Sequence, residues 1–340
     1  MDCFIIFDNE ELPEFQNYEA DVEVKYKGRH RPLSRLLRVL RRYPLMKLSL
    51  SLYKNYYSKL PKSLWNLVNL RELVLTRNSF TSLPSDILNL TKLTKLYAGD
   101  NPLCNLPEAA CRLVQLEVLS VGSCNLRVLP DSFASLRNLQ ELCLDSNSFR
   151  EFPLVICECT NLRELDIANN EIRELPSSIA KLQALTELDV SQNFITDLPA
   201  ALCQLQQLEK LGMRANWLTE VPMPITKLVR LRQLDLSFNH FVSYPLLLGD
   251  LPRLVEFHGY GKLLSIISFS HTNTGHALRG PCPPLIHLQK KRVIPRLSAI
   301  IASGFFCDQA TSWPQFLFQG VYDPRLFLFI FDFAFQERSD

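Results

Sequence analysis

The chain has 340 residues, with 37 basic and 35 acidic side chains and a hydrophobic fraction of 47%. This near balance of charge excludes the strong basic excess of a dedicated nucleic-acid-binding protein, so we expect no nucleic-acid partner. The mean hydropathy is near zero, which argues against both a disordered chain and an integral membrane protein.

Residues 1–43 form a flank that precedes any repeat. Seven acids in residues 8–24 are followed by eight Lys or Arg in residues 25–42. Within the basic part, four leucines at i, i+3, i+4 and i+7 predict an amphipathic helix: Leu33, Leu36, Leu37 and Leu40. We expect this helix to cover the apolar end of the first repeat, as terminal caps must. Docking of its arginines to an anionic membrane surface is the alternative interpretation.

The first residues, MDCFIIFDNEELPEF, hold a short apolar stretch followed by acids, with no basic start. This pattern predicts no secretory signal. Seven of the ten cysteines are scattered between Cys104 and Cys203, without the Cys-rich caps of many extracellular repeat proteins. Reduced thiols in a cytoplasmic protein fit this distribution best, and the inner face of the plasma membrane is the alternative location.

Residues 44–262 repeat with a step of 23 residues. The copy from Leu70 reads LRELVLTRNSFTSLP and the copy from Leu162 reads LRELDIANNEIRELP. Eight such copies start in the same register at Leu70, Leu93, Leu116, Leu139, Leu162, Leu185, Leu208 and Leu231. A degenerate copy starts at Lys47 and a fading tenth starts at Leu254. A fixed period of this length predicts a solenoid of about ten stacked repeats.

Each repeat begins with alternating leucines such as Leu73 and Leu75, which predict a short strand with these side chains inward. A Leu-Pro step such as Leu83-Pro84 comes later, where proline fixes φ and opens the next segment. Apolar pairs three apart, such as Ile87 and Leu90, then predict one helical turn. The predicted fold class is therefore an α/β repeat solenoid, a horseshoe with a concave parallel sheet and short helices or 3-10 turns on the convex side.

A polar side chain recurs after each strand, where an amide can satisfy backbone groups as the chain turns away. These residues are predicted to form a structural ladder: Asn55, Asn78, Asn101, Cys124, Asn147, Asn170, Asn193, Asn216 and Asn239. In one repeat Cys124 replaces the asparagine, and we expect it to be structural rather than reactive.

The pattern LxxLxLxxNxL over residues 44–262 resembles the leucine-rich-repeat family. The 23-residue length with LPxxIxxLxxL on the convex side is similar to the intracellular repeat domains of Scribble, Erbin and the Ras suppressor proteins. The resemblance implies a scaffold or adaptor that binds proteins in signal transduction, in Ras-pathway, polarity or phosphatase complexes. Competing hypotheses are a peripheral membrane scaffold anchored by the basic helix and a ubiquitin-ligase-associated protein.

Residues between the inward leucines face the concave surface and are free to suit a partner. The candidate binding residues run from a basic, aromatic end to an acidic end: Tyr53, Lys54, Arg71, Arg77, Tyr97, Glu141, Asp145, Glu164, Asp166, Glu187, Asp189, Arg214 and Asp235. Trp217 and Phe238 are further aromatic candidates. Like charges on adjacent strands cost free energy unless paired, so they indicate either solvation or a partner protein with a basic segment.

No catalytic motif is found in the sequence. The six histidines have no HxxxH or HExxH spacing, GYGK at 259–262 lacks the full phosphate-loop pattern, and no nucleophile elbow is present. We therefore predict a protein that is not an enzyme and needs no metal or cofactor.

Residues 263–340 lose the period. Ten of the chain's 21 phenylalanines lie beyond residue 262, and LFLFIFDFAF at 326–335 is about half the ~20 residues needed to cross a bilayer. This apolar tail is interpreted as an alternative or misassigned terminus.

Overall fold

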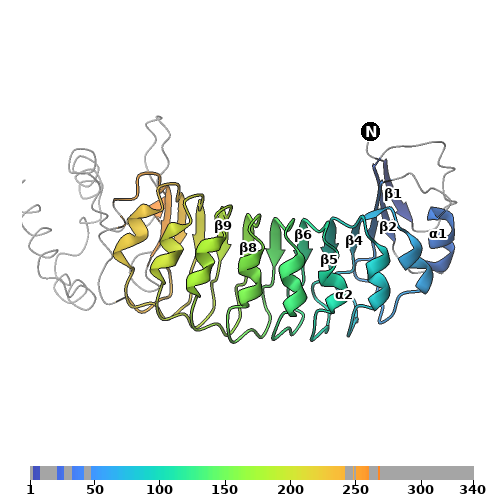
Figure 1. Cartoon of the computed structure of the whole chain (residues 1–340), viewed down its shortest axis with the longest axis horizontal. Coiled ribbons are helices and arrows are strands. Elements are labelled where there is room, and N and C mark those ends of the chain that lie inside the picture. The colour runs from blue at the N-terminus through green and yellow to red at the C-terminus, as the bar shows by residue number, and fades with distance from the viewer. Residues whose placement is uncertain are drawn as a thin grey trace, which may run out of the picture.

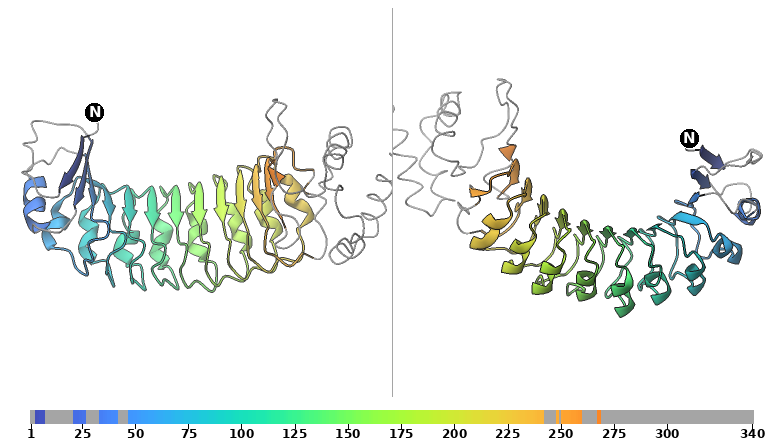
Figure 2. Two further views of the ribbon diagram at one scale, coloured as in Figure 1. Left: turned by 180° about the vertical axis from the view of Figure 1, so that it is seen from behind. Right: turned by 45° about the horizontal axis from the view of Figure 1, so that its top comes forward.

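The computed structural model describes residues 3–7, 21–26, 33–41, 47–241, 248, 250–259 and 267–268. Apart from Ile267 and Ser268, the apolar tail lies outside these residues, so its interpretation stays a prediction. The described part is a curved solenoid with strands on one side and helical turns on the other (Figures 1 and 2).

One sheet holds thirteen strands in chain order. They are β1 (Cys3–Phe7), β2 (Asp21–Tyr26), β3 (Lys47–Ser51), β4 (Leu70–Val74), β5 (Lys95–Tyr97), β6 (Val118–Ser120), β7 (Glu141–Cys143), β8 (Glu164–Asp166), β9 (Glu187–Asp189), β10 (Lys210–Gly212), β11 (Gln233–Asp235), β12 (Glu256–His258) and β13 (Ile267–Ser268). Neighbours from β1 to β12 pair in parallel, and β13 pairs with β12 antiparallel. Because the repeat is 23 residues long, residues 23 apart are neighbours on adjacent strands. Leu188, for example, pairs with Leu165 on one side and with Leu211 on the other.

In the described residues, each repeat from the copy at Lys47 to the copy at Leu208 carries one short turn on the convex side. These are the 3-10 turns η1 (Lys62–Asn66), η2 (Ser85–Asn89), η3 (Asp131–Ser135), η4 (Leu154–Glu158), η5 (Ser177–Lys181), η6 (Ala200–Gln204) and η7 (Met223–Lys227), with the α-helix α2 (Glu108–Cys111) in one repeat. Proline precedes every one of them in extended conformation, which confirms that the Leu-Pro step opens the convex segment.

The core lies between the two layers and runs the length of the solenoid. Strand leucines such as Leu73 and Leu188 and convex residues such as Ile87 and Leu90 are buried. Each buried leucine or isoleucine contributes about 1.5–3 kcal/mol through removal of apolar surface from water. A single repeat cannot bury its own inner face, so neighbouring repeats stabilise one another.

The predicted asparagine ladder is present at the end of the strands. In one repeat the Asn193 amide nitrogen donates to the carbonyls of Ile167 at 3.1 Å and Val190 at 3.0 Å, and its oxygen accepts from the Ile172 N–H at 3.0 Å. Asn193 is thus buried with its donors and acceptor used, and it ties two adjacent repeats together.

Cys124 makes the same kind of contact with a thiol. Its Sγ lies 3.4 Å from the carbonyl oxygens of Ala98 and Gly122, and its backbone N–H donates to Asn147. Burial raises the pKa of the thiol to about 11. The structure therefore supports a structural role, because a protonated, buried thiol is a poor nucleophile.

A feature that the sequence did not predict is a left-handed residue directly before each ladder position. The non-glycine residues that adopt φ between 52° and 58° there are Lys54, Arg77, Asp100, Ser123, Ser146, Asn169, Gln192, Ala215 and Phe238. This conformation costs roughly 1–2 kcal/mol for an L-residue. The ladder side chain that follows holds the turn by bonding to carbonyls just before it and to backbone of the preceding repeat, as Asn193 does with Val190, Ser191 and Ile167.

The N-terminal flank contains the predicted helix, α1 (Leu33–Leu40), whose four leucines are all buried. The helix lies in the convex layer against η1. The prediction was incomplete, however, because β1 and β2 continue the sheet beyond the first repeat (Figure 1). The segment β2–α1 thus acts as one more degenerate repeat, and β1 is the end of the sheet.

Candidate functional site: an acidic groove on the concave face

A groove of about 440 Å³ lies on the concave face across β8 to β12. Two rows of side chains form its floor in register. The first row, here called the glutamate row, is Glu164, Glu187, Lys210, Gln233 and Glu256. The second, the aspartate row, is Asp166, Asp189, Gly212, Asp235 and His258. Six carboxylates thus meet one lysine and one histidine, so the groove is acidic.

Part of this charge is paired within the groove. Lys210 Nζ lies 2.5 Å from Glu187 Oε1, and Glu256 accepts from Gln233 at 2.8 Å and lies 2.8 Å from His258 Nε2. Gly212 has no side chain, and the Asp189 carboxylate occupies the space that a side chain would take. A Cβ at position 212 would lie only 2.5 Å from Asp189 Oδ1. The Asp189 carboxylate therefore leans across the neighbouring strand.

Two further carboxylates, those of Glu164 and Asp166, bear an electrostatic cost. Burial and then the charges of Glu187 and Glu141 raise the pKa of Glu164. Burial raises the pKa of Asp166 too, and the nearby Asp189 and Asp145 add to this, against a hydrogen bond from the Ala168 N–H. Like charges on adjacent strands therefore destabilise the empty groove, and a cationic partner would relieve them.

We expect the double substitution Glu164→Gln and Asp166→Asn to leave the free energy of unfolding unchanged or higher at neutral pH. An acid whose folded pKa is raised binds protons more tightly in the folded state, so its contribution to stability falls as pH rises through the raised pKa. Neutral isosteres remove that penalty, and Asn can still accept from the Ala168 N–H. Urea unfolding at pH 5 and pH 8 measures the effect. A clear loss of stability at pH 8 would contradict a repulsive acidic row.

Cys143 pairs with Asp166, the first residue of the aspartate row, and forms a small cluster with Asp145 and Asp166. Their possible ligand atoms lie within 4.8 Å of one another. The Cys143 thiol donates to Asp145 Oδ1 at 2.9 Å, and burial raises the pKa of this thiol to about 12. A protonated thiol bonded to a carboxylate satisfies that carboxylate without a metal. The sequence analysis missed Cys143, although the 23-residue step places it beside Asp166.

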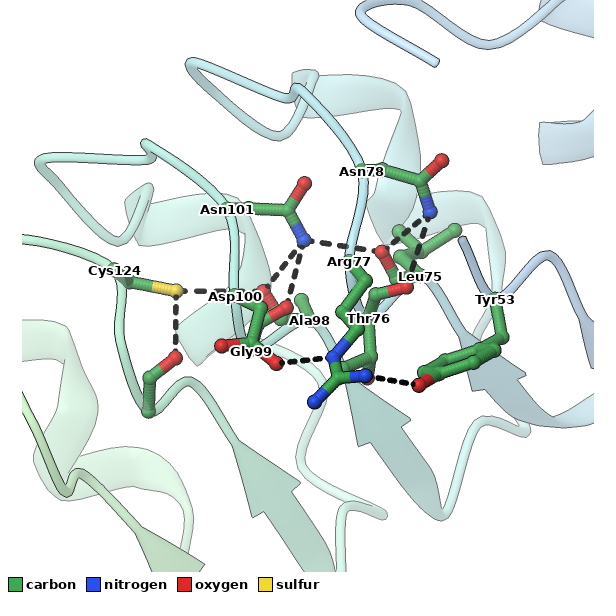
Figure 3. A network of polar contacts seen from close by, with 11 residues as sticks. Tyr53, Leu75, Thr76, Arg77, Asn78, Ala98, Gly99, Asp100, Asn101 and Cys124 are labelled. Carbon is green, nitrogen blue, oxygen red and sulfur yellow. Dashed lines mark hydrogen bonds and ion pairs between the residues drawn. The ribbon is translucent and has the colours of Figure 1, made fainter. Parts of the chain in front are cut away.

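The basic, aromatic candidates lie at the other end of the face (Figure 3). Arg77 donates to Tyr53 Oη at 2.8 Å and to Asp100 Oδ2 at 3.2 Å, and its guanidinium lies 5.6 Å from the Tyr53 ring centroid. Lys54 and Arg77 both occupy left-handed positions beyond the strand ends. Arg77 therefore has partners within the chain while its side chain stays 56% exposed, and the binding role of this end stays a prediction.

The other candidates separate into different parts of the surface. Tyr97 and Glu141 continue the two rows of the floor on β5 and β7. Arg71 instead shares its repeat position with Glu117, Gln140 and Arg163, which line a second hollow at the strand-start edge. Arg71 is thus placed away from the acidic groove. Glu256 and His258 were missed, although extending the 23-residue step into the fading tenth repeat would have found them.

The comparisons with known proteins agree with this geometry. A model of the leucine-rich-repeat region matches residues 153–260, and a model of the single leucine-rich repeat matches residues 69–90. The solenoid therefore has the leucine-rich-repeat fold, and these parts of it match the leucine-rich-repeat family. Leucine-rich-repeat domains generally mediate protein–protein interaction. Among curated proteins, none matches the chain significantly.

Solved leucine-rich-repeat structures share the fold. A leucine-rich-repeat protein of Leptospira interrogans is 26% identical with a TM-score of 0.61, and the match covers 71% of this chain and 64% of that one. A TDR receptor is 26% identical with a TM-score of 0.57, over 71% of this chain and 41% of the receptor. An internalin C2 of Listeria monocytogenes is 21% identical with a TM-score of 0.52, over 59% and 84%. The chain thus spans less than two thirds of the length of the first two.

The basic helix α1 is poorly suited to insertion into a bilayer. Its leucines are buried against the solenoid, and Ser34, Arg35 and Arg38 are exposed on it, as is Arg41 directly after it. Among the helices of the described residues, none is both long and apolar enough to cross a membrane.

Proposed function

We propose that this leucine-rich-repeat domain is a non-enzymatic scaffold or adaptor that holds a basic segment of another protein in its acidic groove. The observation that carries the proposal is the alignment of six carboxylates from four strands, β8, β9, β11 and β12, on a hollowed concave floor, with one lysine from β10 among them. The raised pKa values of Glu164 and Asp166 support it, because burial and then neighbouring carboxylates make the charge of these two groups costly in the folded chain.

The dimensions of the groove suit an extended chain. Five strands at a spacing of ~4.8 Å span roughly 19 Å, which is about six residues of extended peptide. Basic residues of such a segment would pair with acids of both rows. The electrostatic attraction would favour fast association, and salt would weaken it.

The repeat length and the convex LPxxIxxLxxL pattern support placement beside the repeat domains of Scribble, Erbin and the Ras suppressor proteins. On that basis we propose a role in signal transduction in the cytoplasm. The basic helix gives the alternative, a scaffold held at an anionic membrane surface by arginines alone, without insertion of its leucines.

Affinity purification of the full chain, followed by mass spectrometry at 50 and 300 mM salt, tests the proposal. We expect captured proteins with a basic segment whose yield falls at the higher salt. Partners that bind equally at both salt concentrations and lack basic segments would contradict it.

A further inference from the structure

Exposed aromatic side chains gather at the strand-end edge of the same repeats that form the acidic groove. Phe194, Trp217 and His240 occupy one repeat position, directly after the ladder asparagine. Phe194 and Trp217 stack edge to face with ring centroids 5.8 Å apart, and Trp217 and His240 do so at 6.2 Å. These three residues are called the aromatic edge below.

The repeat framework does not require aromatic residues at this position. In the five preceding repeats the position holds small or polar residues: Ser79, Pro102, Asn125, Ser148 and Glu171. The backbone contact does not depend on an aromatic residue, because the N–H of Ser148 donates to Leu126 in the same way as the N–H groups of Phe194 and Trp217 donate to Ile172 and Ile195. The aromatic side chains are thus an addition to the framework and not a part of it.

These rings remain open to solvent in spite of their mutual contacts. Trp217 is 54% exposed and Phe194 is 42% exposed. Phe238, at the left-handed turn of the next repeat, is 51% exposed and carries the Arg214 guanidinium 4.4 Å from its ring centroid. Half-exposed tryptophan and phenylalanine in contact with one another form the kind of surface that dominates protein interfaces.

The aromatic edge belongs to the same repeats as the acidic groove. Phe194 follows Asp189 by five residues, Trp217 follows Gly212 by five, and His240 follows Asp235 by five. The edge therefore comes just after the strand ends, in the direction in which a segment extending from the aspartate row past these ends would run. The acidic floor and the aromatic edge together fit a segment that is cationic and also carries a large apolar side chain.

We infer that the partner segment joins basic residues to one aromatic or large aliphatic anchor, with the basic residues on the acidic floor and the anchor against Trp217 and Phe194. This inference rests on the proposed function of the groove. It adds a specificity element, because a purely basic peptide would satisfy the floor and leave the aromatic edge in water.

Selection from a phage library of random 12-residue peptides against the immobilised full chain tests the inference. The strongest peptide is synthesised, and its dissociation constant is measured by fluorescence anisotropy. The variants are Trp217→Ala, Trp217→Phe and, as a control, Leu154→Ala, whose side chain is 63% exposed on the convex side. Thermal melting confirms that each variant is folded.

We expect enriched peptides with basic residues and an aromatic or large aliphatic residue. Trp217→Ala should weaken the best of them about 30-fold, while Trp217→Phe and Leu154→Ala each change its affinity by less than about 3-fold. Replacement of the apolar residue in the peptide by alanine should weaken binding to the parent chain as much as Trp217→Ala does. The same replacement should not weaken binding to the Trp217→Ala variant any further.

The two claims fail in different ways. Basic peptides that need no apolar residue and bind Trp217→Ala as tightly as the parent chain would overturn the aromatic anchor and leave the acidic groove standing. Enriched peptides without basic residues would overturn the groove itself, and with it this inference.

Discussion

Charge reversal of four groove acids abolishes capture of the partner while the chain stays folded. The variant is Glu164→Lys, Asp166→Lys, Glu187→Lys and Asp189→Lys, which replaces acids of β8 and β9 on the groove floor. Close charge pairs at interfaces couple by several kcal/mol, so we expect a loss of affinity of at least about 100-fold. Pull-down with quantitative mass spectrometry measures the loss, and circular dichroism reports folding.

The chain provides a matched control for this variant. Four acids share another repeat position, two residues before the proline that precedes a convex turn: Glu151, Glu174, Asp197 and Glu220. All four are exposed, and reversing them changes the net charge by the same amount. We expect this control to retain at least half of the captured partner. Equal losses in both variants would show a general charge effect and not a site on the concave face.

Removal of one ladder amide is expected to have the largest effect on stability. Asn193→Ala deletes hydrogen bonds to Ile167, Val190 and Ile172 and leaves their buried backbone groups unpaired. Each unpaired buried group costs about 1–3 kcal/mol, so we expect a loss of about 3 kcal/mol in the free energy of unfolding. Urea denaturation followed by circular dichroism measures it.

Asn161→Ala serves as the control, because the Asn161 amide donates to Arg137 on an exposed loop at 2.8 Å. This change should cost less than about 1 kcal/mol. Asn193→Cys should fall between the two, since Cys124 shows that a thiol fits the same position with fewer hydrogen bonds. Similar losses for Asn193→Ala and Asn161→Ala would contradict a structural ladder.

The repeat made most of the solenoid predictable from sequence. Leu165 and Leu188 had to face each other because a step of 23 relates every copy, and the same step placed Glu164 beside Glu187 and Asp166 beside Asp189. A repeated local pattern of this kind predicts both where each strand lies and how it pairs with the next strand. The acidic groove was therefore predictable as two rows of charge.

Features that depend on contacts outside the repeat were not predictable. β1 and β2 have no 23-residue signature, and their place in the sheet comes from the pairing of β2 with β3 and of β1 with β2. The left-handed turns arise from the ladder and not from glycine, so residues as different as Gln192 and Phe238 adopt them. Arg77 was predicted as a binding residue, but its contacts with Tyr53 and Asp100 only appear in three dimensions.

Site-specific photo-crosslinking from the groove tests the central claim most directly. A benzophenone amino acid replaces Gln233 on the groove floor in one version of the full chain and Leu154 on the convex side in another. After irradiation with the captured partner, mass spectrometry identifies the crosslinked peptides. We predict crosslinks from position 233 to a basic segment of the partner and none from position 154. Crosslinks from position 154 alone would show that the partner binds the convex side and would contradict the acidic groove as the binding site.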